Sequence, residues 1–176
     1  PLITKIATGF GVRCINTPTG FKWMAQKMLK YEEQAQTRIQ EEEGIGLDFD
    51  STELFTRMDI LSRYSTCTVL AAEESYGYLP LDLVRDKDGN ASSLAIAEAF
   101  AYMQSTGTSP LKFLDTIYQK YGYHQEKTEN IYFEGAEGSA TISKLVESYR
   151  KNPFKEVESF KVLKMKDFSE EGFIDE

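Results

Sequence analysis

The sequence contains very few of the residues from which catalytic and metal-binding centres are usually built. Its 176 residues include one histidine, His124, and two cysteines, Cys14 and Cys67. From so little histidine we expect neither a Ser–His–Asp nor a His–Cys catalytic set, and no histidine-based metal site. The cysteines are not spaced as a metal site, so we interpret them as two buried thiols in a reducing cytosol.

Positive charge is also in short supply, and no long apolar run is present. The net charge is −8, which argues against nucleic acid and anionic membranes as partners because their phosphates would be repelled. A small phosphorylated ligand needs only a local cationic pocket and stays compatible. No segment is apolar enough to cross a bilayer or to act as a signal peptide, so we expect a cytoplasmic protein. The start at Pro1, without an initiator Met, suggests a piece of a longer chain.

The apolar residues suffice for one ordinary core, or for one core with a small appendage, since 41% of the chain is hydrophobic. Their spacing predicts an α/β fold, in which helices flank a small mixed β-sheet and a partial strand–helix–strand unit follows. Helices are predicted at about residues 3–10, 21–36, 54–61, 94–105, 109–121 and 142–149, and strands at 12–15, 67–72, 131–133 and 160–165. A capping box is predicted at residues 50–53.

The pattern restarts after Gly122, so we expect two domains. Residues 1–122 form the first, and residues 123–176 form the beginning of a second one that stops before it is complete. The acidic, glycine-containing stretch at residues 41–46 is interpreted as an exposed insertion, and it lies within a longer insertion at about residues 37–64.

The first motif that could bind a ligand is TGFKW at residues 19–23, between a predicted strand and a predicted helix. Gly20 permits close approach of the backbone, and the amides at a helix start favour an anion. Lys22 adds a positive charge beside Thr19 and Gly20. The motif is also compatible with a plain helix start.

The second motif is EESYGY at residues 73–78, directly after a predicted buried strand. Glu73 and Ser75 are two residues apart, so in extended backbone they project to the same side. A carboxylate beside a hydroxyl suits the neighbouring hydroxyls of a sugar. The alternative interpretation is a solvated acidic loop.

The third motif is RDKDG at residues 85–89. Arg85 and Lys87 alternate with two carboxylates, which could orient the two cations as a phosphate clamp. The same residues could form a self-neutralising surface loop, and the sequence alone does not separate the two interpretations.

Taken in this order, the three motifs resemble the third domain of the α-D-phosphohexomutases, the superfamily of phosphoglucomutases and phosphomannomutases. Two further segments are similar to that family, the helix and turn at residues 109–123 and the YRKNP sequence at residues 149–153. The second of these resembles the start of the family's fourth domain. One position departs from the pattern: Ala72 stands where the family often has glycine before the sugar-binding Glu, which puts a close backbone contact there in doubt.

The resemblance implies where a substrate would bind. Glu73 and Ser75 would hold the hydroxyls at positions 3 and 4 of the sugar ring. Gly20 and Thr19 would line the cleft, and Lys87, Lys22 and Arg85 would face a phosphate or the sugar.

For the complete enzyme, an isomerase that acts by intramolecular phosphotransfer, the resemblance implies a phosphoserine and a bisphosphate intermediate. Hexose 1-phosphate and 6-phosphate would be interconverted with Mg²⁺ and glucose 1,6-bisphosphate as cofactors. The phosphoserine loop, the metal loop and the last phosphate-binding loop of that family are not found in this sequence. We therefore expect no catalytic residue, metal or cofactor on this chain, and no turnover by it alone. Its expected partners are a sugar phosphate and the remaining domains of its parent chain.

Alternatives remain open at this point. The chain could be a stand-alone sugar-phosphate binding module or part of a phosphopentomutase-type enzyme, and its acidic surface could instead serve contacts with proteins. Because the chain opens in a helix, we expect the first strand of the family domain to be missing. That would leave an exposed sheet edge, and we expect marginal stability or pairing between two copies.

Overall fold

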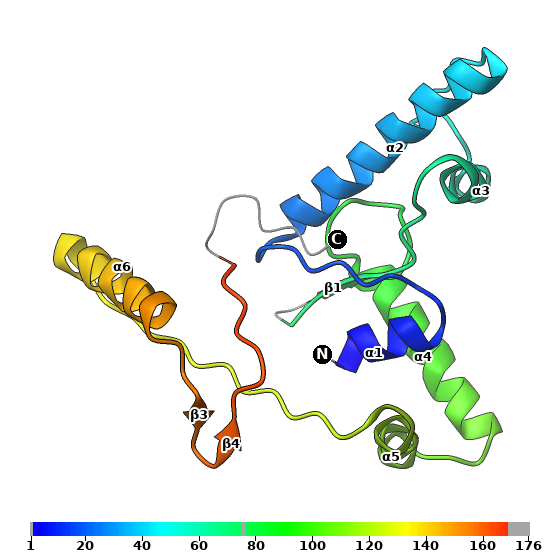
Figure 1. Ribbon diagram of the computed structural model, residues 1–176. Coiled ribbons are helices and arrows are strands. Elements are labelled where there is room, and N and C mark those ends of the chain that lie inside the picture. Colours follow the sequence, from blue (N-terminus) through cyan, green and yellow to red (C-terminus); the bar gives the residue numbers. More distant parts are fainter. Residues whose placement is uncertain (1, 75–76, 169–176) are drawn as a thin grey trace. The chain divides into compact units, whose positions relative to one another are not determined.

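The computed structural model describes residues 2–74 and 77–168 (Figure 1). The elements, in chain order, are α1 (Leu2–Gly9), α2 (Phe21–Glu43), α3 (Leu54–Tyr64), β1 (Ala71–Glu73), β2 (Gly77–Leu79), α4 (Gly89–Ser105), α5 (Pro110–Tyr121), α6 (Gly135–Lys151), β3 (Glu156–Val157) and β4 (Phe160–Lys161). The predicted α/β class is confirmed. Ser75 lies outside the described residues, so its predicted role has no structural account.

The described chain divides into two compact units, residues 2–122 and residues 123–168. Each is described by itself below. Their assignment as the third and fourth domains of a larger protein stays a prediction.

Helix α2 is the longest element of the first unit and organises it. Gly20, just before the helix, has φ 121°, and Gly44, just after it, has φ 69°. Both angles are easy for glycine and rare for other residues, which explains where the helix begins and ends. The prediction of an end near residue 36 was wrong. Residues 41–43 are exposed, and they form the last helical turn, because glutamate is a good helix former and Gly44 supplies the left-handed stop.

Two clusters of buried side chains line one face of α2. The cluster near the start of the helix joins α2 to both strands of the first hairpin: Phe21, Met28, Ala71 and Leu79, with Met24 packed against them. The cluster near the end joins α2 to α3 and the loop before it: Tyr31, Ala35, Phe49 and Leu61. The α2 members of both clusters repeat every three or four residues, the spacing of one helix face. Helix α2 therefore fixes the hairpin at one end and α3 at the other.

The sheets are smaller than the sequence predicted. Strands β1 and β2 pair antiparallel, with Ala71 opposite Leu79 and Glu73 opposite Gly77. Residues 67–70 and 12–15, predicted as strands, are not strands in the described structure. The error has a physical reason, since an apolar, β-branched segment becomes a strand only where a partner strand is present.

Local signals placed several helix ends correctly. Ser109 accepts a hydrogen bond from the amide of Lys112 at the start of α5, Pro110 occupies the first position, and Gly122 follows its last turn, as predicted. The predicted capping box at 50–53 was wrong, because the cap of α3 is Glu53 itself, whose carboxylate accepts from the amides of Phe55 and Thr56. The two amides lower the pKa of Glu53.

The second unit contains α6 and the β3–β4 hairpin. Helix α6 begins seven residues before the predicted start at residue 142. Residues 131–133, predicted as a strand, are not one in the described structure, and only the first two residues of the strand predicted at 160–165 pair. Neither segment has a longer partner strand in this unit to pair with.

Cys14 and Cys67 are free thiols and are half-buried, not fully buried as predicted. Within the described residues, no helix combines the length and apolar character that a membrane crossing requires.

Candidate functional site

The structure brings one residue from each of the three sequence motifs together around the carboxylate of Glu73. The backbone N–H of Gly20 donates to Oε1 of Glu73 at 2.6 Å. The Nζ of Lys87 lies 2.9 Å from Oε2 of the same carboxylate. The Glu73 side chain is 7% exposed and that of Lys87 37% exposed. The shielded carboxylate of Glu73 therefore lies between the amide of Gly20, at the start of a helix, and the partly accessible ammonium of Lys87. Gly20 precedes Glu73 by 53 positions and Lys87 follows it by 14, so residues distant in sequence meet at this site.

Local packing explains why Glu73 reaches the start of α2. Glu73 is the last residue of β1, and Ala71 and Leu79 of the hairpin pack on Phe21 and Met28 of α2. This contact sets the end of β1 beside the first turn of the helix. Gly20 then presents its N–H from a φ of 121°, which a residue with a side chain rarely adopts.

Lys87 reaches Glu73 across the hairpin and over an aromatic ring. Its Nζ lies 4.5 Å from the centre of the Phe21 ring, within the range of a cation–π contact. A Cβ atom at Gly77 would lie 2.6 Å from Cγ of Lys87, closer than real atoms approach. Gly77 therefore leaves the space through which the aliphatic part of Lys87 passes.

The amide of Asp88 donates to the carbonyl of Tyr78 at 3.1 Å, which ties the residue after Lys87 to strand β2. Asp88 also accepts from the amides of Asn90 and Ala91 and so caps α4. Lys87 is thus held between a strand and a helix start, although it belongs to neither.

The pKa of the Glu73 carboxyl is lowered, above all by the hydrogen bond from Lys87. Burial acts in the opposite direction, and the Gly20 amide and the charge of Lys87 lower the pKa further. Asp86 raises it by charge repulsion. The net direction keeps Glu73 ionised at neutral pH, so that it accepts hydrogen bonds and does not donate them.

The remaining predicted residues lie elsewhere or outside the described part. Thr19 is exposed beside Gly20. Lys22 lies over the ring of Trp23, with its Nζ 5.0 Å from the ring centre. The guanidinium of Arg85 pairs with the carboxylate of Glu32 on α2. The structure thus brings Gly20, Glu73 and Lys87 together and turns Arg85 toward a different partner.

Sequence reasoning missed Glu32, Arg57 and Asp82, whose ion pairs attach the loop that carries Lys87 to α2 and α3. A signal for Glu32 was present. It follows Met28 by four residues and precedes Ala35 by three, so it is a charged residue on the buried face of α2. A charge in that position requires a partner.

The described residues offer no metal site, since they contain no group of three or more His, Cys, Asp or Glu side chains that could hold an ion. A carboxylate that already binds Lys87 and an amide is suited to binding hydroxyls and is poorly suited to coordinating Mg²⁺, which prefers several oxygen ligands.

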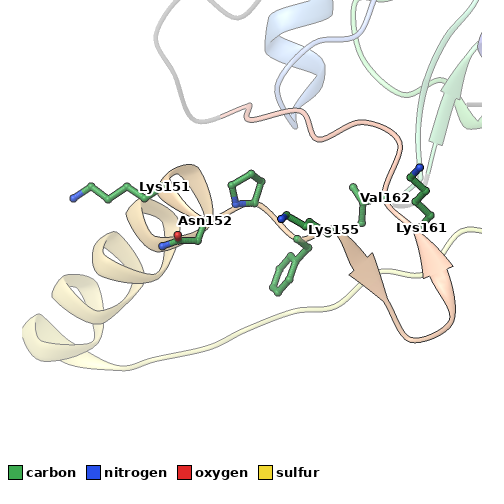
Figure 2. Close-up of a pocket in the computed structure, with 7 residues that line it drawn as sticks. Lys151, Asn152, Lys155, Lys161 and Val162 are labelled. Carbon is green, nitrogen blue, oxygen red and sulfur yellow. The ribbon is translucent and has the colours of Figure 1, made fainter.

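The second unit has an open pocket between the end of α6 and the β3–β4 hairpin. It is lined by Lys151, Asn152, Pro153, Phe154, Lys155, Lys161 and Val162. Figure 2 shows that the side chains of Lys151 and Lys161 extend in different directions. Lys151 also pairs with Glu147 at 2.7 Å. The lysines do not converge on one point, so this pocket is a weaker candidate than the Glu73 site.

Comparison with known proteins finds relatives that are all phosphoglucomutases among those described below. Phosphoglucomutases from a bovine strain of Staphylococcus aureus, from Staphylococcus aureus strain USA300 and from Staphylococcus haemolyticus are each 32% identical to this chain over 100 residues. The similarity covers 57% of this chain and 18% of each relative, so the chain matches less than a fifth of their length. No family model matches the chain. No solved structure matches it either. The similarity to the phosphoglucomutases agrees with the resemblance of the sequence to the phosphohexomutase superfamily.

Proposed function

We propose that this chain supplies the sugar-binding surface of a phosphohexomutase, with Glu73 accepting hydrogen bonds from ring hydroxyls and Lys87 contacting the sugar or its phosphate. The observation that carries the proposal is that the Gly20 amide and the Lys87 ammonium both contact the carboxylate of Glu73. The phosphoglucomutase relatives support it, because their name refers to glucose and to phosphate.

The geometry leaves hydrogen-bonding capacity at both groups. A carboxylate has about four lone-pair positions, and one on each oxygen of Glu73 is taken by Gly20 or Lys87. An ammonium has three donors, so Lys87 retains donors for an oxygen of the ligand. Lys87 is partly exposed and Glu73 is not, which favours approach of the ligand from the lysine side.

The other predicted residues keep smaller roles in the proposal. Ser75 would donate to or accept from a second hydroxyl, and Thr19 and Lys22 would border the site next to Gly20. Arg85 is engaged by Glu32, so we assign it no contact with the ligand.

For the parent protein we propose interconversion of hexose 1-phosphate and hexose 6-phosphate through a phosphoserine. The phosphoserine, Mg²⁺ and glucose 1,6-bisphosphate would act on other parts of that protein. The chain alone is then expected to bind without turnover. The alternative, a stand-alone sugar-phosphate binding module, predicts the same contacts on this chain. The two are distinguished by whether the codons before and after this sequence encode the phosphoserine, metal and phosphate-binding loops of the family.

The proposal is tested by calorimetric titration of the 176-residue chain with glucose 1-phosphate, and in parallel with glucose and with inorganic phosphate. Glucose 1-phosphate should bind best, and Glu73→Gln and Lys87→Met should each weaken it by about tenfold or more, as loss of a charge-assisted hydrogen bond requires.

Glu74→Gln is the matched control, since Glu74 is the exposed neighbour of Glu73 and changes the net charge equally. Binding that responds equally to Glu73→Gln and Glu74→Gln would show a general charge effect and contradict the proposed site. Absence of any binding by the folded chain would also contradict it.

A further inference from the structure

The loop between β2 and α4, residues 80–88, carries Lys87 but has no strand or helix of its own. Two arginines hold it from different sides. Arg57 of α3 donates to the carbonyl of Asp82, and its guanidinium lies 4.0 Å from the Asp82 carboxylate. Arg85, within the loop, pairs with Glu32 of α2. The loop is therefore attached to both helices before it reaches Lys87.

Three of the four charged side chains in these ion pairs are shielded from water. Glu32 is 5% exposed, Asp82 8% and Arg57 14%, whereas Arg85 is 30% exposed. A buried charge is tolerated only beside an opposite charge or a hydrogen-bond partner, so the loop cannot leave this position without exposing or orphaning a charge.

Two atoms in the same cluster, Oε1 of Glu32 and Nε of Arg57, are buried and have no hydrogen-bond partner in the described part of the chain. Glu32 therefore depends on Arg85 alone through its other oxygen. Removing Arg85 would leave a buried carboxylate with no partner, a larger penalty than losing an ordinary surface ion pair.

From this arrangement we propose that Arg57 and the Glu32–Arg85 pair are positioning residues, which hold the 80–88 loop so that Lys87 reaches Glu73. The inference rests on the proposed function for its purpose, since Lys87 matters only if the Glu73 site binds a ligand. Helix α2 contacts both parts of the site. Gly20, at its start, holds one oxygen of Glu73, and Glu32, eleven residues after the first residue of the helix, holds the loop. The span between them is about 18 Å along the helix axis.

The alternative is that these pairs only stabilise the fold. The test therefore needs a readout that follows the contact between Lys87 and Glu73 directly. The pKa of the Glu73 carboxyl, measured by carbon NMR in the 176-residue chain, is such a readout, because Lys87 is the main cause of its lowering. Lys87→Met defines the pKa that Glu73 has when the contact is lost.

Arg57→Met and Arg85→Met should raise the Glu73 pKa toward the value in Lys87→Met and weaken glucose 1-phosphate binding several-fold. Arg57→Lys, which can still donate to the Asp82 carbonyl, should restore much of both. Arg63→Met is the matched control, because Arg63 lies on the same helix as Arg57 and forms an exposed pair with Asp59. It should change neither quantity.

If circular dichroism shows that Arg85→Met does not fold, Glu32→Leu replaces it, since leucine removes the acceptor for Arg85 and leaves no buried carboxylate without a partner. An unchanged Glu73 pKa in the folded Arg57 and Arg85 or Glu32 variants, with Lys87→Met shifting it, would overturn the inference. An unchanged pKa in Lys87→Met itself would overturn it as well.

The two proposals fail in different ways. If the pKa pattern appears as expected but the wild-type chain does not bind glucose 1-phosphate, the positioning role of the arginines stands and the proposed function does not.

Discussion

Replacing Gly77 by alanine should separate Lys87 from Glu73 without removing either charge. The new Cβ would lie 2.6, 2.7 and 2.9 Å from Cγ, Cδ and Cβ of Lys87. Cβ and Cγ are close to the backbone and cannot move away as the tip of a flexible side chain could. The loop or the lysine must therefore shift, and the Nζ should leave the carboxylate.

The cost follows from overpacking at a single methyl group, about 2 kcal/mol. With a urea slope of about 2 kcal/mol per M for a unit of this size, the midpoint of unfolding should fall by about 1 M. Trp23 is the only tryptophan and lies in the first turn of α2, so its fluorescence reports on the unit that contains the site. Carbon NMR should show a raised pKa for Glu73 in the same variant.

Gly89→Ala is the matched control. Gly89 is the first residue of α4, two positions after Lys87, and nothing lies within 4 Å of a Cβ built there. Alanine in a helix should be neutral or stabilise by up to about 1 kcal/mol. An unchanged urea midpoint and an unchanged Glu73 pKa in Gly77→Ala would refute the account of how Lys87 is held.

Three further outcomes are expected. Leu79→Ala should cost about 2–5 kcal/mol, because Leu79 is 2% exposed at the centre of the hairpin cluster, whereas the same change at Leu163, 90% exposed, should cost almost nothing; equal urea midpoints would contradict the described core. Asp88→Ala removes the cap of α4 and should cost about 1 kcal/mol in thermal or urea unfolding, and no loss would show that the cap does not form. Because the pKa of Glu73 is lowered below its ordinary value of 4.5, its stabilising contribution is complete above that pH and is lost as the pH falls through the lower, folded value. The difference in unfolding free energy between wild type and Glu73→Gln should therefore shrink on acidification below pH 4.5. A difference that grows would contradict a lowered pKa for Glu73.

Helices were predictable from the sequence where local chemistry decides them. Ser109 and Pro110 mark the start of α5, and Gly122 its end, through contacts within a few residues. Strands were less predictable because they depend on distant partners. Residues 67–72 look like one buried strand, yet only Ala71 and Ala72 of that segment pair, as the partner strand β2 has three residues.

The candidate site was predictable in its residue types and not in its geometry. The motifs pointed to Glu73, Lys87 and Gly20 separately, but their contact depends on the packing of Leu79 and Phe21, which no short-range pattern specifies. Arg85 illustrates the limit. Its spacing beside Lys87 suggested a shared ligand, whereas the buried carboxylate of Glu32 directs it to α2.

The most direct test of the central claim is a glucose 1-phosphate titration followed at the amide resonance of Gly20 by NMR. That amide is hydrogen-bonded to Glu73, so it should shift and saturate as the ligand engages the carboxylate, and the shift should vanish in Glu73→Gln. A Gly20 resonance that stays in place throughout the titration of a folded chain would contradict the account.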